Sequence, residues 1–275
     1  MSSPKVVSLL RIIVKHVMMK IICSLVMLLL PALGMSQTAD SVKVLWIGNS
    51  YTYYNDMPAI VRGLALSQGF PLQPTKITKG GERFSGHLKN PKLHEALKQG
   101  GWDYIVLQEQ STEPAQLTSE VITNVYPYAH ELDSLALAGS PQAKVIFYMT
   151  WGHRNGNARK DTPYPLDNTY ELMQERLKTS YIEMAWMNHA WCAPVGMAWQ
   201  MMRHRHPGWN LYRKDNFHPN RLGSYLAANV FLTTILQHEY TSKYTAGLPR
   251  KQAREAQRIA QKAVLDNLQL LGIKR

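Results

Sequence analysis

The chain has 275 residues, of which 45% are apolar and 18% are charged. This composition excludes an intrinsically disordered chain and a fibrous repeat, and the length fits one α/β domain. The net charge of +12 does not indicate nucleic-acid binding, because the basic residues are scattered and none of their stretches is interleaved with stacking aromatics.

The first 36 residues have the pattern of an export signal. They hold four basic residues and no acidic one, so their removal lowers the net charge of +12 by four. From Met19, a lysine is followed by the apolar run 21–30 and then by small residues up to Ser36. We therefore predict a signal peptide over residues 1–36, cleavage near Ser36, and export to the periplasm or the cell exterior.

Residues 1–18 precede Met19, from which a complete signal peptide could begin, and a mis-assigned start codon would explain these extra residues. The rival interpretation, one membrane anchor over residues 6–30, would place Arg11 and other charges in the apolar layer, where each is costly. We therefore expect no lasting membrane anchor. Cys192 is the lone cysteine after the signal, so no internal disulfide can hold the fold.

Apolar runs alternate with helix-like segments from residue 42 onward. The runs that indicate strands are 42–48, 72–78, 102–107, 144–150 and 191–195. The helix-like segments are 57–68, 88–98, 120–137, 169–189, 196–203, 219–238 and 249–271. This alternation is typical of parallel strands joined by crossover helices, and we expect one domain over residues 37–275.

Reactive groups collect beyond the carboxyl ends of the strands in an open parallel sheet. Ser50 lies there, where the first strand ends and a helix is about to begin, so its hydroxyl would be exposed near helical N–H groups. A serine after Gly-Asn is also a common turn or helix-capping residue. A serine becomes a nucleophile only when an imidazole takes its proton and a third group orients that imidazole.

Asp215 and His218 supply such a pair. They are three residues apart and are followed by Pro219, so one tight turn can place the carboxylate beside the ring. The alternative is an aspartate that caps the next helix and a surface histidine. A neutral imidazole both accepts and returns a proton near neutral pH.

An oxyanion that develops during acyl transfer needs two or three hydrogen-bond donors. Gly81 offers a backbone N–H that no side chain obstructs, and Gln110 offers a side-chain amide after the third strand. Gln108 is the second choice for that amide. Gly-Gly can also mark a simple turn, and either glutamine can bond loop backbone instead.

These motifs together resemble the SGNH (GDSL-like) hydrolase superfamily over most of the chain after the signal. The four matching blocks are VLWIGNSYT, KGGERFSGH, YIVLQEQS and DNFHPNRLGSYLAAN. The resemblance implies a three-layer α/β/α, flavodoxin-like fold with a five-stranded parallel sheet. It also implies roles for individual residues: Ser50 as nucleophile, His218 as base, Asp215 as its orienting acid, and Ser50 N–H, Gly81 and Gln110 as oxyanion donors.

Two positions depart from the family pattern. Asn49 replaces the usual aspartate beside the nucleophile, which keeps the shape and removes a charge. The family's Gly-x-Asn-Asp block is absent, and Gln108-Glu109-Gln110-Ser111 stands in its place. Counting from the strand end puts Gln110 over the family's asparagine.

Further residues near the strand ends are candidates for substrate contact. We expect Trp151, His153 and Tyr51 to line the substrate pocket, with Arg154 as a further candidate and Tyr53 and Tyr54 as an aromatic wall. The alternative is that Trp151 packs on the edge of the sheet and that the tyrosines cover the first helix. A second site is not indicated: Glu109 has no evident role, and the segment 204–206, with two histidines, lacks a third metal ligand at a recognisable spacing.

The sequence thus favours an exported serine ester hydrolase that needs neither metal nor organic cofactor and acts on a small-molecule or polysaccharide ester. Removal of O-acyl groups, acetyl above all, from carbohydrate is the expected reaction. Two alternatives stay open: a lipase- or thioesterase-type esterase, and a glycan-binding module that has kept the fold without turnover. The oligomeric state is not indicated.

Overall fold

A parallel β-sheet forms the centre of the structure. The computed structural model describes residues 15, 41–157 and 167–273, so the predicted signal peptide lies outside the described residues except for Lys15. The strands are β1 (Val42–Gly48), β2 (Leu72–Thr78), β3 (Tyr104–Leu107), β4 (Lys144–Tyr148) and β5 (Trp191–Ala193). All neighbours are parallel, in the order β2-β1-β3-β4-β5. This is the flavodoxin-like order, so the predicted fold class is confirmed.

The apolar runs form strands because the sheet is covered on both faces. In β1, Val44, Leu45, Trp46 and Ile47 are all fully buried, so both faces of this strand contact apolar side chains. Such a strand has a continuous apolar sequence and does not alternate with polar residues. β2, at the edge of the sheet, is mixed in burial.

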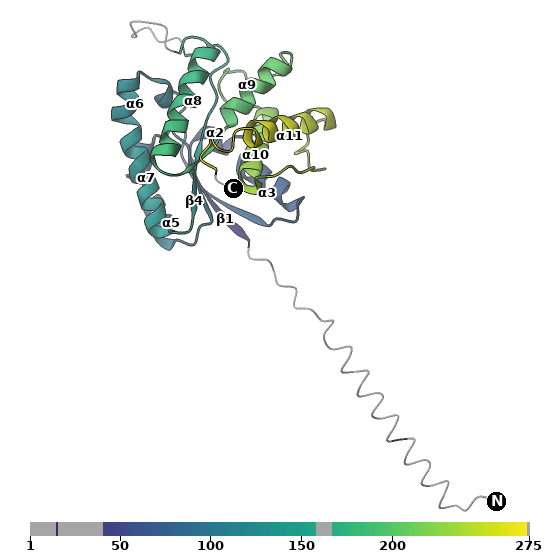
Figure 1. Cartoon of the computed structure of the whole chain (residues 1–275), viewed down its shortest axis with the longest axis horizontal. Coiled ribbons are helices and arrows are strands. Elements are labelled where there is room, and N and C mark those ends of the chain that lie inside the picture. The colour runs from purple at the N-terminus through teal and green to yellow at the C-terminus, as the bar shows by residue number, and fades with distance from the viewer. Residues whose placement is uncertain (1–14, 16–40, 158–166, 274–275) are drawn as a thin grey trace, which may run out of the picture. The chain divides into compact units, whose positions relative to one another are not determined.

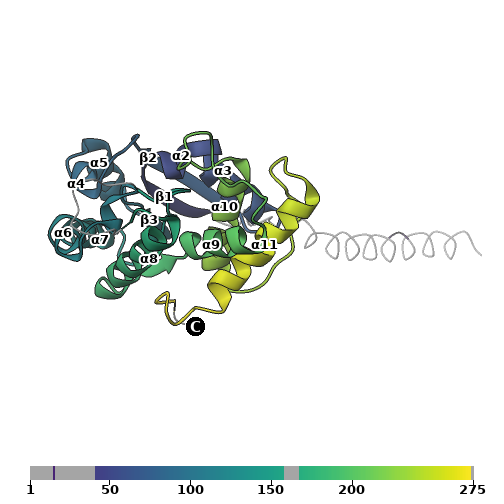
Figure 2. The ribbon, with the colours of Figure 1, turned by 90° about the horizontal axis from the view of Figure 1, so that it is seen from above.

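Helices cover the two faces of the sheet (Figure 1). They are α2 (Ser50–Tyr53), η2 (Tyr54–Asp56), α3 (Met57–Leu66), α4 (Phe84–His87), α5 (Pro91–Gln99), η3 (Glu113–Ala115), α6 (Thr118–Asn124), α7 (Tyr126–Gly139), α8 (Tyr170–Met187), α9 (Val195–Arg205), α10 (Arg221–Leu236) and α11 (Arg250–Leu265). Figure 2 shows α5, α7 and α8 on one side of the sheet and α3, α10 and α11 on the other.

Proline changes the bounds of two predicted helices. The expected helix over 88–98 begins only at Pro91, as α5, after an Asn90 cap, and α4 ends just before the predicted range. The expected helix over 120–137 becomes α6 and α7, with Pro127 in the first turn of α7. Proline fits the first turn of a helix because its missing N–H has no partner there anyway. Each change therefore follows from a residue visible in the sequence.

Helix α10 lies in the middle of its layer. Every residue from 222 to 235 is buried, and α10 packs against α3, α9 and α11. Asn220 caps its N-terminus by accepting a hydrogen bond from the N–H of Gly223. The helix begins three residues after His218, so it anchors the segment that carries the imidazole. Within the described part of the chain, no helix is long and apolar enough to cross a bilayer.

Candidate active site

Ser50, His218 and Asp215 meet beyond the carboxyl end of β1. The Oγ atom of Ser50 lies 2.8 Å from Nε2 of His218, and Nδ1 of His218 lies 2.9 Å from Oδ2 of Asp215. Because a carboxylate only accepts, Nδ1 carries the proton and donates to Asp215. Nε2 is then free to accept the hydroxyl proton of Ser50. The geometry is that of a nucleophile, a base and an orienting acid in hydrogen-bond reach of one another.

The turn between Asp215 and His218 holds the carboxylate in place. Oδ1 of Asp215 accepts hydrogen bonds from the backbone N–H groups of Phe217, at 3.1 Å, and His218, at 2.9 Å. Partial burial acts to raise the pKa of Asp215, but the hydrogen bonds from the His218 ring and the two N–H groups lower this pKa overall. Asp215 is therefore ionised near neutral pH and stabilises a positively charged imidazole.

Ser50 is held by the end of a buried strand and by a short helix. It is the first residue of α2 and is 8% exposed. The side chain of Asn49 caps this helix by accepting from the N–H of Tyr51 at 3.1 Å, and its amide donates to the carbonyl of Glu82 at 3.1 Å. An aspartate could not make the second bond. The asparagine that departs from the family pattern therefore links the nucleophile to the loop after β2.

The predicted oxyanion donors lie in the loops after β2 and β3. Gly81 is exposed and adopts a φ of +68°, which favours glycine, and no atom lies within 4 Å of the position a Cβ would take. The side-chain carbonyl of Gln110 accepts hydrogen bonds from Thr112 N and Oγ1, at 2.7 and 2.9 Å. The NH₂ group of Gln110 donates to no other residue within the described part of the chain. Gly81 and Gln110 thus stay candidates for the donors to a developing negative charge.

The buried carboxyl group of Glu109 connects these two loops. It accepts from the backbone N–H of Phe84 at 3.0 Å and from that of Gln110 at 2.6 Å. Burial raises the pKa of Glu109 to about 8, against the effect of these two N–H groups; nearby Glu113 raises it further and Arg83 lowers it. A salt bridge of 2.7 Å between Arg83 and Glu113 joins the same loops at the surface. Glu109, for which the sequence indicated no role, thus sets how the two loops lie.

The second-choice donor, Gln108, is already used inside the protein. Its Oε1 accepts hydrogen bonds from Asn49 N at 2.9 Å and Thr52 Oγ1 at 3.0 Å, and its amide donates to the carbonyl of Glu109. Gln108 is fully buried. It is therefore excluded as an oxyanion donor in this conformation, and it positions Asn49 instead.

Two of the residues expected to line the substrate pocket are in the core. Tyr51 is 2% exposed and Trp151 is 0% exposed, so neither can contact a substrate. The two rings stack with centroids 4.3 Å apart, and Trp151 stacks in turn on Trp199 at 4.0 Å. The indole N–H of Trp151 donates to the carbonyl of Phe217 at 3.0 Å. The expectation is corrected: this aromatic stack supports the loop beside His218 from behind.

The third expected pocket residue, His153, is half-buried beside the catalytic loop. Its ring lies 5.3 Å from that of Phe217. Burial, followed by the proximity of His218, lowers the pKa of His153 to about 4, so the ring is neutral near pH 7. Tyr54, 4.4 Å from the His218 ring, and exposed Tyr53 flank the site as the sequence suggested. Phe217 was not identified as a site residue from the sequence, although its position directly before His218 indicated such a role.

No metal site accompanies these groups within the described part of the chain. Among the described residues, no three histidine, cysteine, aspartate or glutamate side chains are placed to hold a metal ion. His206 instead lies 2.9 Å from Oε1 of Glu255, which also pairs with Arg205 and Arg258.

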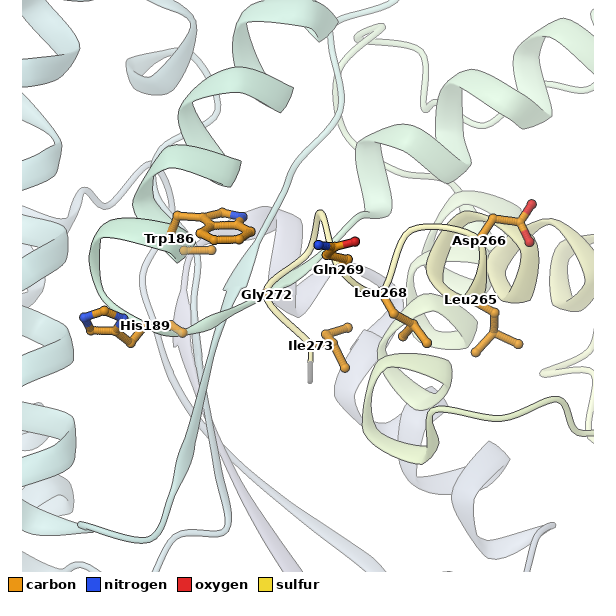
Figure 3. Close-up of a pocket in the computed structure, with 10 residues that line it drawn as sticks. Trp186, His189, Leu265, Asp266, Leu268, Gln269, Gly272 and Ile273 are labelled. Carbon is orange, nitrogen blue, oxygen red and sulfur yellow. The ribbon is translucent and has the colours of Figure 1, made fainter. Parts of the chain in front are cut away.

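A cavity lies away from the residues of the candidate active site. It measures about 780 Å³ and is lined by the end of α8 and the C-terminal segment, including Trp186, Leu268 and Ile273 (Figure 3). Its residue Ala190 precedes β5, whereas Ser50 follows the carboxyl end of β1. Because the strands are parallel, the cavity belongs to the opposite end of the sheet.

The chain is similar in fold to several solved structures. Neither a family model nor a curated protein matches the chain. Among solved structures, a DUF4886 family protein from Bacteroides uniformis is 19% identical, covers 82% of this chain and 95% of its own, and has a TM-score of 0.67. A protein from Slackia heliotrinireducens described as a candidate SGNH hydrolase is 27% identical, covers 71% and 100%, and has a TM-score of 0.56.

A third solved structure is the esterase EstA from a Pseudoalteromonas species. It is 11% identical, covers 72% of this chain and 98% of its own, and has a TM-score of 0.52. The sheet order and these similarities agree. The chain therefore has the fold of the SGNH/GDSL-like hydrolase superfamily, as the resemblance of its motifs implied.

Proposed function

We propose that this protein is a serine ester hydrolase. The observation that carries the proposal is a pair of hydrogen bonds that joins the three residues. One links Ser50 Oγ to His218 Nε2 at 2.8 Å, and the other links His218 Nδ1 to Asp215 at 2.9 Å. The similarity in fold to a candidate SGNH hydrolase and to an esterase supports it. A glycan-binding module without turnover would have no need to keep three reactive groups aligned.

The reaction follows from the geometry. His218 Nε2 takes the proton of Ser50 as Oγ attacks the ester carbonyl carbon, and the carbonyl oxygen becomes an oxyanion. Donors at Ser50 N–H, Gly81 and Gln110 would stabilise that charge. Collapse breaks the bond to the alcohol, which leaves with the proton from His218. Water then attacks the acyl-enzyme with His218 again as base, and this releases the acid and restores Ser50.

The substrate we propose is an O-acylated, above all O-acetylated, carbohydrate. Tyr53, Tyr54 and Phe217 give the surroundings of Ser50 flat aromatic surfaces with at least partial exposure, and such surfaces pack well against the apolar face of a sugar ring. Export through residues 1–36 would bring the enzyme to polysaccharides outside the cytoplasm. That segment lies outside the described residues, so the export proposal rests on the sequence pattern.

Hydrolysis of p-nitrophenyl acetate by the purified protein tests the esterase proposal. We expect Ser50→Ala and His218→Ala each to lower kcat by ~10³-fold or more, since the residues of such a triad act as a unit. A fluorophosphonate probe should label Ser50 and leave the Ser50→Ala variant unlabelled. Equal rates in all three proteins would exclude the esterase.

Substrate class and export need separate measurements. Acetate release from acetylated xylan and pectin should exceed the hydrolysis of p-nitrophenyl esters with long acyl chains; the reverse preference would indicate a lipase-type enzyme. Cell fractionation and N-terminal sequencing should find the protein outside the cytoplasm with a terminus near Gln37. An intact N-terminus on cytoplasmic protein would contradict export.

A further inference from the structure

A polar pocket of about 410 Å³ lies beside the His218 loop. Its walls include Arg154 and Asn155 after β4, Arg203 in the last turn of α9, and Trp209, Asn210 and Tyr212 in the segment that leads to Asp215. The residues come from three parts of the chain that meet next to the site described above. None of them has a part in the ester chemistry proposed for Ser50.

Backbone hydrogen bonds link the pocket to the loop that carries Asp215 and His218. The backbone N–H of Arg154 donates to the carbonyl of Asn216 at 2.8 Å. Arg213, which directly follows the pocket residue Tyr212, donates its backbone N–H to the carbonyl of His218 at 2.8 Å. The residues that line the pocket are therefore joined to the loop that carries His218.

Two guanidinium groups give the pocket its charge. The guanidinium carbon of Arg203 lies 3.9 Å from the ring centroid of Tyr170, and Arg203 donates to the Arg154 carbonyl at 3.3 Å. Arg154 lies 5.2 Å from the ring centroid of Tyr212 and donates one Nη to the side chain of Asn210. The aromatic rings and backbone fix both groups in place. Arginines held in this way lose little freedom when they bind a ligand.

These charges have no partner among the described carboxylates. No ion pair joins Arg154 or Arg203 to a described acidic residue, although Glu171 also lines the pocket. The Nε atom of Arg154 is buried and has no hydrogen-bond partner within the described part of the chain. Two arginines and one glutamate leave the pocket with an excess positive charge, which favours an anion.

We propose that this pocket binds the carboxylate of an acidic sugar, a uronic acid residue of the substrate, while an O-acyl group on the same glycan reaches Ser50. This inference rests on the proposed esterase function. Guanidinium groups match the planar carboxylate with paired hydrogen bonds. Trp209, which stacks on His206 with one face, lines the pocket and can pack against the sugar, and the exposed amide of Asn155 is suited to its hydroxyl groups.

Calorimetric titration of the full-length Ser50→Ala protein tests the pocket without turnover. The probes are trigalacturonate and its methyl ester, which has the same sugars and no negative charge. We expect trigalacturonate to bind at least about tenfold more tightly than the methyl ester, because a charge-assisted hydrogen bond is worth roughly 1.5–3 kcal/mol. Binding should weaken as salt is added. Equal affinity for the two probes would overturn the proposal.

Variants locate the binding. In the same background, Arg203→Gln and Arg154→Gln should each weaken trigalacturonate binding at least about tenfold. Arg205→Gln is the matched control, because Arg205 is also in α9 but pairs with Glu255 at 2.8 Å. Thermal unfolding checks that each variant is folded. If Arg203→Gln does not fold, the result with Arg154→Gln decides. Unchanged affinity in the folded Arg154→Gln or Arg203→Gln variant would place the ligand elsewhere and overturn the assignment.

Other anions separate the sources of negative charge. Inorganic sulfate and phosphate should compete only weakly with trigalacturonate; if either binds more tightly, the pocket is a site for sulfated or phosphorylated groups and the uronate proposal is wrong. Ester hydrolysis is measured separately on the wild-type protein with p-nitrophenyl acetate. Trigalacturonate binding without ester hydrolysis would refute the esterase proposal and support the anion pocket. Ester hydrolysis without preferential binding of trigalacturonate would refute the pocket and support the esterase.

Discussion

Ser50 and His218 approach each other from two regions that are held in different ways. On the Ser50 side, Asn49 and Gln108 are 2% and 0% exposed, and buried side chains make the hydrogen bonds. On the His218 side, the Asp215 side chain is 33% exposed, and the loop depends on its own turn and on the aromatic stack behind it.

The difference has a consequence for mutations. Changes on the Ser50 side disturb buried hydrogen bonds, so they should lower stability and activity together. Changes to exposed groups on the His218 side should lower activity with little effect on stability, because solvent replaces the lost contacts. Four variants test this contrast.

The largest effect is expected for Asp215→Asn. The amide cannot accept the Nδ1 proton in the same way, so the ring can take the wrong tautomer, and kcat should fall on the order of 10³–10⁴-fold. The free energy of unfolding should change by less than about 1 kcal/mol, because the carboxylate is partly exposed. Enzyme kinetics and urea unfolding measure the two effects. Asp266→Asn, an exposed change on the surface, is the control and should alter neither.

Glu109→Gln should affect both properties. The amide has an NH₂ group in place of the second oxygen, so the contact of the Phe84 N–H with Oε2 is lost and two donors face each other. The value of kcat/KM should fall about 10- to 100-fold because the donors at Gly81 and Gln110 shift. An ordinary rate with unchanged stability would show that Glu109 does not position these loops.

The same variant should change the pH dependence of stability. The folded-state pKa of about 8 lies above that of an unfolded glutamate, so folded protein binds this proton more tightly and wild-type stability falls as pH rises from 6.5 to 8. The contribution is at most about 1.4 kcal/mol per pH unit. Urea unfolding should show a smaller slope for Glu109→Gln, while the exposed control Glu131→Gln keeps the wild-type slope.

Trp151→Phe should have an intermediate effect, because Trp151 contacts both Tyr51 on the Ser50 side and Phe217 on the His218 side. It removes the hydrogen bond to the Phe217 carbonyl and leaves the stack on Tyr51 smaller, so kcat/KM should fall about tenfold through a less well placed imidazole. Trp46→Phe is the matched control: Trp46 is equally buried, but its indole N–H has no partner among the described residues. A similar rate loss in both variants would contradict a role for the bond to Phe217.

The smallest effect is expected for Asn49→Asp, which restores the residue usual in the family. The cap on Tyr51 is kept, but a carboxylate oxygen replaces the donor to the Glu82 carbonyl, so kcat/KM should fall about threefold. Asn90→Asp, which keeps a comparable helix cap away from the site, is the control. A faster enzyme would mean that the link to Glu82 has no value for catalysis.

The sequence predicted the parts of the site that depend on local spacing. The apolar runs located the strands, and the short spacing of Asp215, His218 and Pro219 predicted the turn that the structure contains. Ser50 could be placed because a residue directly after a buried strand lies at the carboxyl end of the sheet.

Long-range packing could not be predicted in the same way. Tyr51 and Trp151 are next to reactive segments in the sequence, but only the contact with Trp199 on α9 shows that they face the core. Gln108 and Gln110 have similar chemistry and differ only in the direction in which the end of β3 points them. The roles of Asn49 and Glu109 depend on the loop after β2, whose path the sequence did not reveal.

The attachment of His218 to α10 affects how the enzyme loses activity. Backbone amides in residues 222–235 are enclosed on all sides, so their hydrogen exchange should require opening of the whole domain. The imidazole is tied through Pro219 to this slowly exchanging segment. Inactivation by heat or urea should therefore coincide with global unfolding and not precede it, and a partly denatured sample should behave as a mixture of fully active and fully inactive molecules.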